Sequence, residues 1–536
     1  MIYLIIPPVS DCFMPTLGIA QIAGYLKSNG IVCRTVDSSA ELLHILLEQW
    51  KEKETYTFKD AVACLEQYSS IHSGLKITVD DFQTGFDWRE MDKLLEYVEN
   101  DSLFSGELKK LSFICEENSG TGKGDVYGFS ISYDCQVIPA MLLVQIIKEK
   151  RPEAKICIGG SLLYNYENDF YKLMYLTNWI DILIIGSGEE VWKYIGKEGT
   201  EKLDVLSGID IRHMQDRYII DTRKSKEKPI VYEPDFSDFD FGYYLSDKKA
   251  FPYMIKDRCY YGKCYFCNGD KVEEQSVSKD IKTAFEKMNK IADSIGIRNI
   301  YIVDAALSPK DLDTIARLPN MGLCWIANGR FDKRMEDERL IEAIAQRGCV
   351  MLRFGLESAS QKVLDYMNKG TRVSVAENVL KLTARYGIEN HVYLMFGYPG
   401  EMKEDREMTV EFMERNRTVI SSYSVSLFQP IPETIVYEQL LECIKEDENV
   451  YEQMIQMLYK DEFYYAEIYE DISRINDVLC GYARTNVEYY SANIFNRFPD
   501  KKRQKTIETI EGKEPTVTKE KIRKEIRIQF LPENKL

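Results

Sequence analysis

Three cysteines lie close together in the segment DRCYYGKCYFCNGD, residues 257–270. They are Cys259, Cys264 and Cys267, and their spacing is C-x4-C-x2-C. A structural zinc site needs four ligands, and the histidines all lie far from this segment: His44, His72, His213 and His391. A [4Fe–4S] cluster is usually held by four thiolates, so three would leave one iron open to a substrate or cofactor. The pattern favours an open iron–sulfur cluster, and structural zinc is the alternative.

The overall composition is that of a globular protein. The chain has 536 residues, too many for one compact core, so we expect several domains. No run approaches the ~20 apolar residues that a membrane span needs, so we expect no membrane association. The N-terminal segment MIYLIIPPVSD reads as a buried strand and lacks the basic leader of a signal peptide, which favours a cytoplasmic location.

Charge and cysteine usage narrow the class of protein further. The formal net charge is −17, and no basic stripe occurs before a short basic stretch near residues 500–505. A nucleic-acid partner is therefore not expected. Most of the 13 cysteines are scattered singly through apolar stretches, as buried hydrophobic side chains are, and do not suggest a disulfide framework. Only the group at residues 259–267 is clustered, which singles it out as a site.

Strands and helices alternate through residues 1–195, apart from a polar, largely helical insert at about 41–120 of unknown purpose. Short apolar strands that end in Gly, Ser or Asp, with helices between them, predict an open, doubly wound parallel sheet. Ligands bind such sheets at the carboxyl ends of the strands. The strands that we expect are Ile2–Ile6, Val32–Val36, Asp125–Ser132, Ile156–Gly160 and Ile180–Gly186.

A second alternating series occupies residues 251–434, after a connector at 196–250. Its regularity predicts a barrel or partial barrel of βα units, in which chemistry occurs at the strand carboxyl ends. The cysteine segment follows the first of these strands, where that rule places a site. Residues 435–536 are predicted to be a helical C-terminal region, either a cap that contacts substrate or a solvated extension. The expected barrel strands are Phe251–Lys256, Asn299–Asp304, Gly322–Ala327, Val350–Leu356, His391–Phe396 and Tyr423–Phe428.

A three-cysteine loop after the first strand of a βα barrel resembles the radical S-adenosylmethionine (SAM) superfamily. The usual family spacing is C-x3-C-x2-C with an aromatic residue before the last cysteine, here Phe266 in CYFC. The first gap is one residue longer in this chain, and we expect Gly262 to accommodate the longer loop. Three further segments resemble family elements in the right order: NIYIVDAALS, LRFGLESASQKVLDYMNKGT and YLMFGYPGEMKEDREMTVEFM, where Met402 replaces the usual Thr.

The resemblance implies a partial TIM barrel of (β/α)6 type and a set of residues that bind SAM. The cysteines would hold a [4Fe–4S] cluster whose open iron binds the amino and carboxylate groups of SAM. An electron from an external flavodoxin- or ferredoxin-type donor would cleave SAM to methionine and a 5′-deoxyadenosyl radical, which takes hydrogen from a substrate. The residues implied to contact SAM are Phe266, Asp304, Glu357, Ser358, Gly397, Pro399 and Gly400.

Residues 1–195 resemble the Rossmann-like cobalamin-binding domain that precedes many radical SAM barrels. The matching segments are PPVSDCFMPTLGIAQIAGYLKSNGIVCRTVD, DVYGFSIS, IKEKRPEAKICIGG and DILIIGSGEE. The D-x-H-x-x-G motif, which supplies an axial histidine in other cobalamin proteins, is absent here, as it commonly is in this branch. The small residues implied to admit the corrinoid and its tail are Thr16, Leu17, Gly18, Ser130, Ser132, Gly159, Gly160, Gly186 and Gly188.

Together, the two resemblances imply a cobalamin-dependent radical SAM methyltransferase. It would methylate an unactivated carbon, or a phosphorus centre, of a small-molecule or peptide substrate. One alternative keeps the radical chemistry and replaces methyl transfer by a rearrangement, cyclisation or cross-link. A second alternative is a non-catalytic iron–sulfur or zinc scaffold. The substrate itself does not follow from the sequence.

Overall fold

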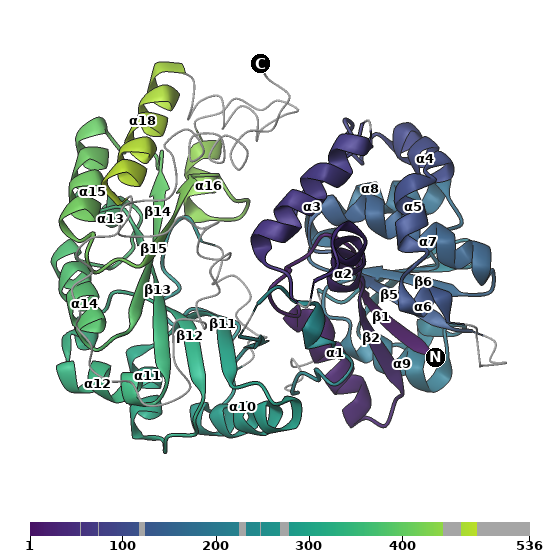
Figure 1. Cartoon of the computed structure of the whole chain (residues 1–536), viewed down its shortest axis with the longest axis horizontal. Helices are drawn as coiled ribbons and strands as arrows, with labels where there is room; N and C mark the ends of the chain where they lie inside the picture. Colours follow the sequence, from purple (N-terminus) through teal and green to yellow (C-terminus); the bar gives the residue numbers. More distant parts are fainter. Residues whose placement is uncertain are drawn as a thin grey trace. The chain divides into compact units, whose positions relative to one another are not determined.

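The computed structural model describes residues 1–53, 55–72, 74–116, 124–223, 232–246, 248–267, 278–442 and 462–479 (Figure 1). The chain divides into two compact units. The first contains Met1–Tyr253 and Ile291–Ile297, and the second contains Met254–Lys290 and Arg298–Leu536. Among the described helices, none is long and apolar enough to cross a membrane.

A seven-stranded sheet with the order β2-β1-β5-β6-β7-β9-β8 forms the centre of the first unit. All neighbours pair in parallel except β8 and β9, which are antiparallel. The chain runs from β1 outward to β2 and then returns to the other side of β1, so the strand order reverses between β1 and β5. Ligands of doubly wound sheets bind at such a reversal. The strands are β1 (Ile2–Ile6), β2 (Cys33–Asp37), β5 (Val126–Ser130), β6 (Lys155–Gly159), β7 (Ile182–Ile185), β8 (Asp210–Met214) and β9 (Arg217–Asp221).

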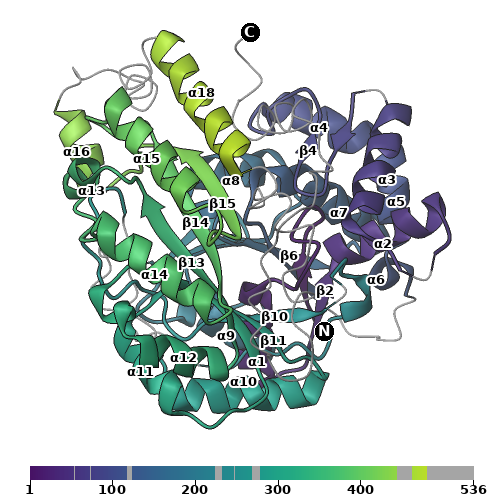
Figure 2. The same cartoon turned by 60° about the vertical axis from the view of Figure 1, so that its left-hand side comes forward.

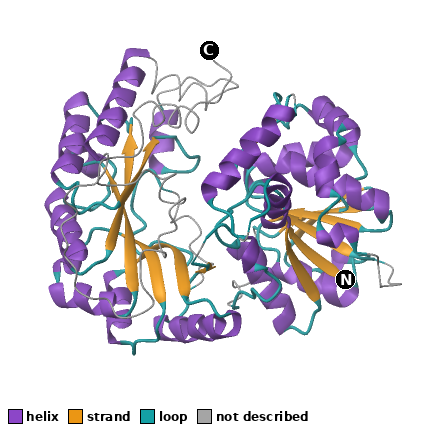
Figure 3. Ribbon diagram, viewed as in Figure 1, coloured by secondary structure: helices purple, strands orange, loops and turns teal. Residues whose placement is uncertain are grey.

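The central strands of this sheet are apolar along their whole length. In β7, Ile182–Ile185, each side chain is buried, as expected for a parallel strand covered on both faces. Figure 3 shows purple helices on either side of these orange strands. Helices α1 and α9 pack against each other, while α7 contributes most of its side chains to the larger core. The helices are α1 (Leu17–Ser28), α2 (Ser38–Trp50), α7 (Val137–Lys150), α8 (Leu163–Leu176) and α9 (Glu189–Glu198).

The insert between β2 and β5 belongs to the core of the first unit. Several of its large apolar side chains are buried in the same cluster as those of α7. They are Leu65, Trp88, Leu94, Phe104 and Phe113. The sequence of the insert is polar overall because only a minority of the residues in each helical turn are apolar. This is the pattern of an amphipathic helix. The insert consists of α3 (Phe58–Ile71), β3 (Lys76–Ile77), β4 (Phe82–Gln83), α4 (Met91–Asn100), α5 (Leu103–Leu108) and α6 (Ser112–Cys115).

The stretch expected as a connector contains structure that the sequence did not indicate. Its first half forms the β8–β9 hairpin at the edge of the sheet. Its second half packs on α1, where the ammonium of Lys27 lies 2.7 Å from a carboxylate oxygen of Asp235 and 2.9 Å from one of Asp238. The first unit therefore extends beyond residue 195 to Tyr253.

A six-stranded sheet with the order β10-β11-β12-β13-β14-β15 builds the partial barrel. Strands β11 to β15 pair in parallel with their sequence neighbours, so each βα unit adds one strand in turn. The strands are β10 (Ala250–Tyr253), β11 (Asn299–Leu307), β12 (Cys324–Gly329), β13 (Cys349–Glu357), β14 (Glu389–Phe396) and β15 (Ser422–Leu427). The helices between them are α10 (Ile281–Ile295), α11 (Pro309–Arg317), α12 (Glu338–Gln346), α13 (Gln361–Tyr366), α14 (Val373–Arg385) and α15 (Lys403–Arg415).

Two described helices follow the barrel, α16 (Ile435–Leu441) and α18 (Glu462–Leu479). Figure 2 shows α18 lying beside α15. The fully buried guanidinium of Arg406 on α15 holds α18, with Nε 2.7 Å from Asp471 and Nη2 3.0 Å from Glu467. The rest of the predicted helical region at 435–536 lies outside the described residues.

Candidate functional site

The cysteine segment forms a loop after β10. The backbone N–H of Cys267 donates to the carbonyl of Cys264 at 3.1 Å, which closes a tight turn between the last two cysteines. Cys259 and Cys264 are partly buried, and Cys267 is exposed. Gly262 has a φ of 59°, in the left-handed region that glycine occupies at little cost. The longer first gap thus contains a turn that favours glycine.

The cysteine loop is docked on the segment that follows α13. The N–H of Tyr265 donates to the carbonyl of Met367 at 2.9 Å, and the Tyr261 hydroxyl donates to the carbonyl of Asn368 at 2.9 Å. The side chain of Asn368 donates in return to the carbonyl of Lys263 at 2.8 Å. Gly370 makes this contact possible, because a Cβ there would lie 2.3 Å from the Tyr261 hydroxyl oxygen. The sequence identified this segment as a family element. It did not indicate that the segment binds the cysteine loop by hydrogen bonds.

Two cations border Cys264. A guanidinium N–H of Arg330 donates to its Sγ at 3.5 Å. Burial raises the pKa of the Cys264 thiol, while the charges of Lys369 and Arg330 lower it. Neither cation belongs to the set predicted from the sequence, although Lys369 lies in a segment that resembles a family element.

The candidate donor set consists of three thiols on one loop. Within the described residues, no three His, Cys, Asp or Glu side chains gather closely enough to hold one ion. A structural zinc site requires its ligands at about 2.0–2.3 Å from a common centre. In a [4Fe–4S] cluster each thiolate ligates its own iron, so three cysteines could serve three of the four irons.

Asp304, near the end of β11, binds the backbone just before the cysteine loop. Its carboxylate accepts hydrogen bonds from the N–H of Ile255 at 2.7 Å and of Lys256 at 2.9 Å. Burial raises the pKa of this carboxyl to about 7, against the lowering effect of those two N–H groups. The structure therefore gives Asp304 a positioning function that the sequence did not indicate.

Glu357 ends β13 in an unusual backbone conformation. Its φ is 64°, and the N–H of Ser358 donates to the carbonyl of Leu356 at 2.9 Å, which together define a tight γ-turn of positive φ. The Glu357 carboxylate pairs with Lys369 at 2.7 Å. Strain of this kind at the carboxyl end of a barrel strand is typical of a functional position.

Ser358, the neighbour of Glu357, is fully buried on the helix side of the sheet. Its hydroxyl lies 3.3 Å from that of Thr409 on α15, and it accepts from the N–H of Ser360 at 3.1 Å. These contacts fix the strand end against α15. The two neighbours thus have different surroundings. Glu357 contacts Lys369, which lies next to the cysteine loop, whereas Ser358 contacts Thr409 of α15.

The turn after β14 carries Gly397, Pro399 and Gly400. Gly397 and Gly400 have φ values of 80° and 85°, which explains both glycines. Glu401 closes the turn, because its carboxylate accepts from the N–H of Gly397 at 2.7 Å. Burial raises the pKa of Glu401 to about 8.

Phe266 connects the cysteine loop with this turn. Its ring meets that of Tyr398 edge to face with centroids 6.4 Å apart, and the Lys369 ammonium lies 5.4 Å from its centroid. Phe266 and Glu357 therefore share Lys369 as a neighbour, and Phe266 also meets the turn at residues 397–400 through Tyr398.

The structure explains some of the small residues predicted along the first sheet by packing, and it places others at strand ends or in open space. A Cβ on Gly160 would lie 2.2 Å from the carbonyl of Ile131, and one on Gly186 would lie 2.4 Å from the Thr222 hydroxyl, so the fold itself requires both glycines. Gly18 faces open space. Ser130 and Gly159 are register partners at the carboxyl ends of β5 and β6. The remaining predicted positions, Thr16, Leu17, Ser132 and Gly188, likewise follow strands β1, β5 and β7.

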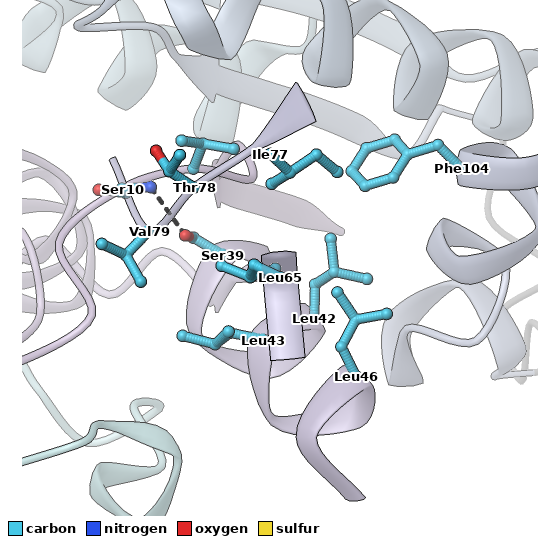
Figure 4. Close-up of a pocket in the computed structure, with 11 residues that line it drawn as sticks. Ser10, Ser39, Leu42, Leu43, Leu46, Leu65, Ile77, Thr78, Val79 and Phe104 are labelled. Atoms are coloured by element: carbon cyan, nitrogen blue, oxygen red, sulfur yellow. Dashed lines mark hydrogen bonds between the residues drawn. The ribbon is translucent and has the colours of Figure 1, made fainter. Parts of the chain in front are cut away.

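A small pocket lies in the first unit, near the carboxyl end of β1 (Figure 4). The walls are leucines of α2 and α3 with Ile77 and Phe104, and the N–H of Ser10 donates to the Ser39 hydroxyl at 2.8 Å. Val9 lines it with a φ of 67°, rare for a β-branched residue. None of the small residues predicted for cobalamin lines this pocket, and the one sequence signal for it is the apolar stripe of α2.

Comparison with known proteins identifies the barrel. Residues 253–413 match the family model described as the radical SAM superfamily. The chain therefore contains the radical SAM domain predicted from the cysteine loop.

Two curated relatives align with larger parts of the chain. An uncharacterized methyltransferase of Pyrococcus horikoshii is 23% identical over 48% of this chain, which spans 58% of that protein. An anaerobic magnesium-protoporphyrin IX monomethyl ester cyclase of Cereibacter sphaeroides is 23% identical over 56% of this chain and 51% of its own length. The chain thus spans little more than half the length of these two relatives.

A solved structure covers both units. Radical S-adenosylmethionine methyltransferase TsrM from Kitasatospora setae, with cobalamin and a [4Fe–4S] cluster bound, matches 82% of this chain and 78% of its own, with a TM-score of 0.50 and 16% sequence identity. This likeness confirms the predicted fold class, a Rossmann-like sheet and a partial barrel. The three cofactors predicted from the sequence are those named for TsrM and for the superfamily.

Proposed function

We propose that the chain is a radical SAM enzyme that uses cobalamin to methylate an unactivated carbon, or a phosphorus centre, of a small-molecule or peptide substrate. The observation that carries the proposal lies within the domain matching the radical SAM superfamily. There the cysteine loop is docked so that Cys264, Phe266 and Glu357 share one neighbourhood. An external flavodoxin- or ferredoxin-type donor supplies electrons.

Cys259, Cys264 and Cys267 would hold the [4Fe–4S] cluster, which when bound supplies the electron for SAM cleavage. The chain's own contribution is positioning and exclusion of water. Asp304 fixes the root of the loop through two backbone N–H groups. The ring of Phe266, packed on Tyr398, gives the loop an apolar side that keeps water from the reacting atoms.

Glu357 is the side chain best suited to contact the amino group of SAM. Its carboxylate is buried, ends a barrel strand and already binds an ammonium, that of Lys369. The turn at Gly397, Pro399 and Gly400 has the bare backbone that close approach of a planar adenine needs.

The first unit would hold cobalamin, which when bound carries the methyl group. The likeness to TsrM over both units supports this assignment, and so does the reversal of strand order between β1 and β5. Of the predicted positions, Ser130 and Gly159 lie at the carboxyl ends of β5 and β6, and a Cβ on Gly18 would meet nothing within 4 Å.

A second candidate function is a radical cyclisation or rearrangement without methyl transfer. The likeness to an anaerobic magnesium-protoporphyrin ester cyclase favours it over other radical reactions.

Anaerobic reconstitution of the full chain tests both candidates. We expect a brown protein with about four irons per chain that converts SAM to 5′-deoxyadenosine and methionine once reduced. Added cobalamin should bind near one per chain, and SAM labelled in its methyl group should transfer the label to cobalamin. Radical cleavage without such labelling would favour the cyclase class. Retention of full iron content in Cys264→Ala would refute the site.

A further inference from the structure

Arg330 lies one residue beyond β12 and connects three parts of the site. One guanidinium nitrogen donates to Cys264 Sγ at 3.5 Å, and the other terminal nitrogen donates to the carbonyl of Lys369. The guanidinium carbon lies 3.9 Å from the centroid of the Tyr261 ring. The side chain is buried, so water screens none of these contacts well.

We propose that Arg330 is a positioning residue that raises the reduction potential of the cluster held by the cysteine loop. This inference rests on the proposed function, because it requires Cys264 to be a cluster ligand. Hydrogen bonds to cluster sulfurs and nearby positive charge are among the factors that set iron–sulfur potentials. Both favour the reduced cluster, which carries one more negative charge.

The geometry explains why arginine occupies this position. A guanidinium offers N–H groups in a rigid planar fork, so one side chain can donate to a sulfur and to a carbonyl at once. Its flat face also stacks on an aromatic ring. A lysine ammonium would keep the charge and lose both the fork and the stacking on Tyr261.

The competing explanation is that Arg330 only ties the cysteine loop to Lys369. That function predicts loss of stability and of bound iron on substitution, with an unchanged potential in whatever cluster remains. The potential is therefore the measurement that separates the two functions.

The experiment is a redox titration of the reconstituted full chain, followed by electron paramagnetic resonance of the reduced cluster, with iron, sulfide and thermal unfolding measured in parallel. Arg330→Met removes the fork and the charge at similar length, and Arg330→Lys keeps the charge alone. Arg334→Met is the matched control, because Arg334 lies on the same segment, is exposed and pairs with Asp332 at 3.1 Å.

In Arg330→Met we expect the ratio of reduced to oxidised cluster at a fixed potential to fall about tenfold, which equals about 59 mV for one electron. Arg330→Lys should lie between this variant and the wild type, and Arg334→Met should match the wild type. A wild-type potential in Arg330→Met would overturn the inference. If that variant does not retain a cluster, a wild-type potential in Arg330→Lys overturns it equally. A wild-type chain that assembles no cluster would instead refute the proposed function.

Discussion

The ammonium of Lys369 lies 2.7 Å from the carboxylate of Glu357, and both side chains are buried. The pair joins the strained end of β13 to the segment on which the cysteine loop is docked. Removal of one partner leaves the other as an uncompensated buried charge, which typically costs about 3–5 kcal/mol.

Lys369→Met should therefore destabilise the folded chain by roughly this amount, about 3–5 kcal/mol. Glu357→Gln in the same chain should restore most of the loss, because the buried charge is then gone. Urea denaturation of both variants and of the double variant measures the coupling. Equal losses in Lys369→Met and the double variant would contradict a direct interaction.

Glu401 should make stability depend on pH. Burial raises its folded pKa to about 8 from an ordinary value of 4.5. The unfolded chain therefore releases this proton at a lower pH than the folded chain does, so the stabilising contribution is complete below the ordinary pKa and is lost as the pH rises towards 8. Glu401→Gln keeps an acceptor for the Gly397 N–H and removes the titration.

The measurement is the urea midpoint between about pH 5 and pH 8. The difference in stability between Glu401→Gln and the wild type should shift in favour of the variant as the pH rises. A constant difference across this range would show that Glu401 ionises normally.

Gly370→Ala should weaken the binding of the cysteine loop to the segment after α13. The new Cβ would collide with the Tyr261 hydroxyl at 2.3 Å, and the φ of 66° adds backbone strain. Gly387→Ala is a matched control, because its φ is 71° and a Cβ there meets nothing within 4 Å. Both should lose about 1–2 kcal/mol to the backbone, but only Gly370→Ala should also lose bound iron after reconstitution. Equal iron content in the two variants would show that the loop tolerates the collision.

Arg406→Met should release α18 from α15. Arg406 is fully buried against Asp471 and Glu467, and Arg474 lies 3.3 Å from the other oxygen of Asp471, so the loss of Arg406 should cost about 1.5–3 kcal/mol for its charged hydrogen bonds. Arg415→Met, which removes an exposed pair with Glu377 from the same helix α15, should cost about 1 kcal/mol or less. Hydrogen exchange of residues 462–479 measures the release. Unchanged protection of this helix in Arg406→Met would show that apolar packing alone holds it.

The elements that carry strong local patterns were predictable. Strands such as β1 and β13 are largely apolar, and their expected ranges, Ile2–Ile6 and Val350–Leu356, differ little or not at all from the structure. The β8–β9 hairpin was not predictable, because its outer strand, Asp210–Met214, is mostly exposed and lacks an apolar face.

Within the site, the cysteine loop and its aromatic Phe266 could be identified from residue type and spacing. The partners of Asp304 and Ser358 could not, because they are tertiary contacts with N–H groups near β10 and with Thr409. Arg330 was missed for a related reason. Its significance lies in a distance to Cys264, which is separated from it by most of two βα units.

The left-handed turn at Gly262 bears on how such sites are searched for. Counting residues between cysteines treats a longer gap as a defect, whereas the longer gap here contains a glycine in the left-handed conformation. A glycine inside the gap is thus a feature of the backbone that gap length alone does not describe. Family patterns that admit one more residue where a glycine follows the first cysteine would retain chains of this kind.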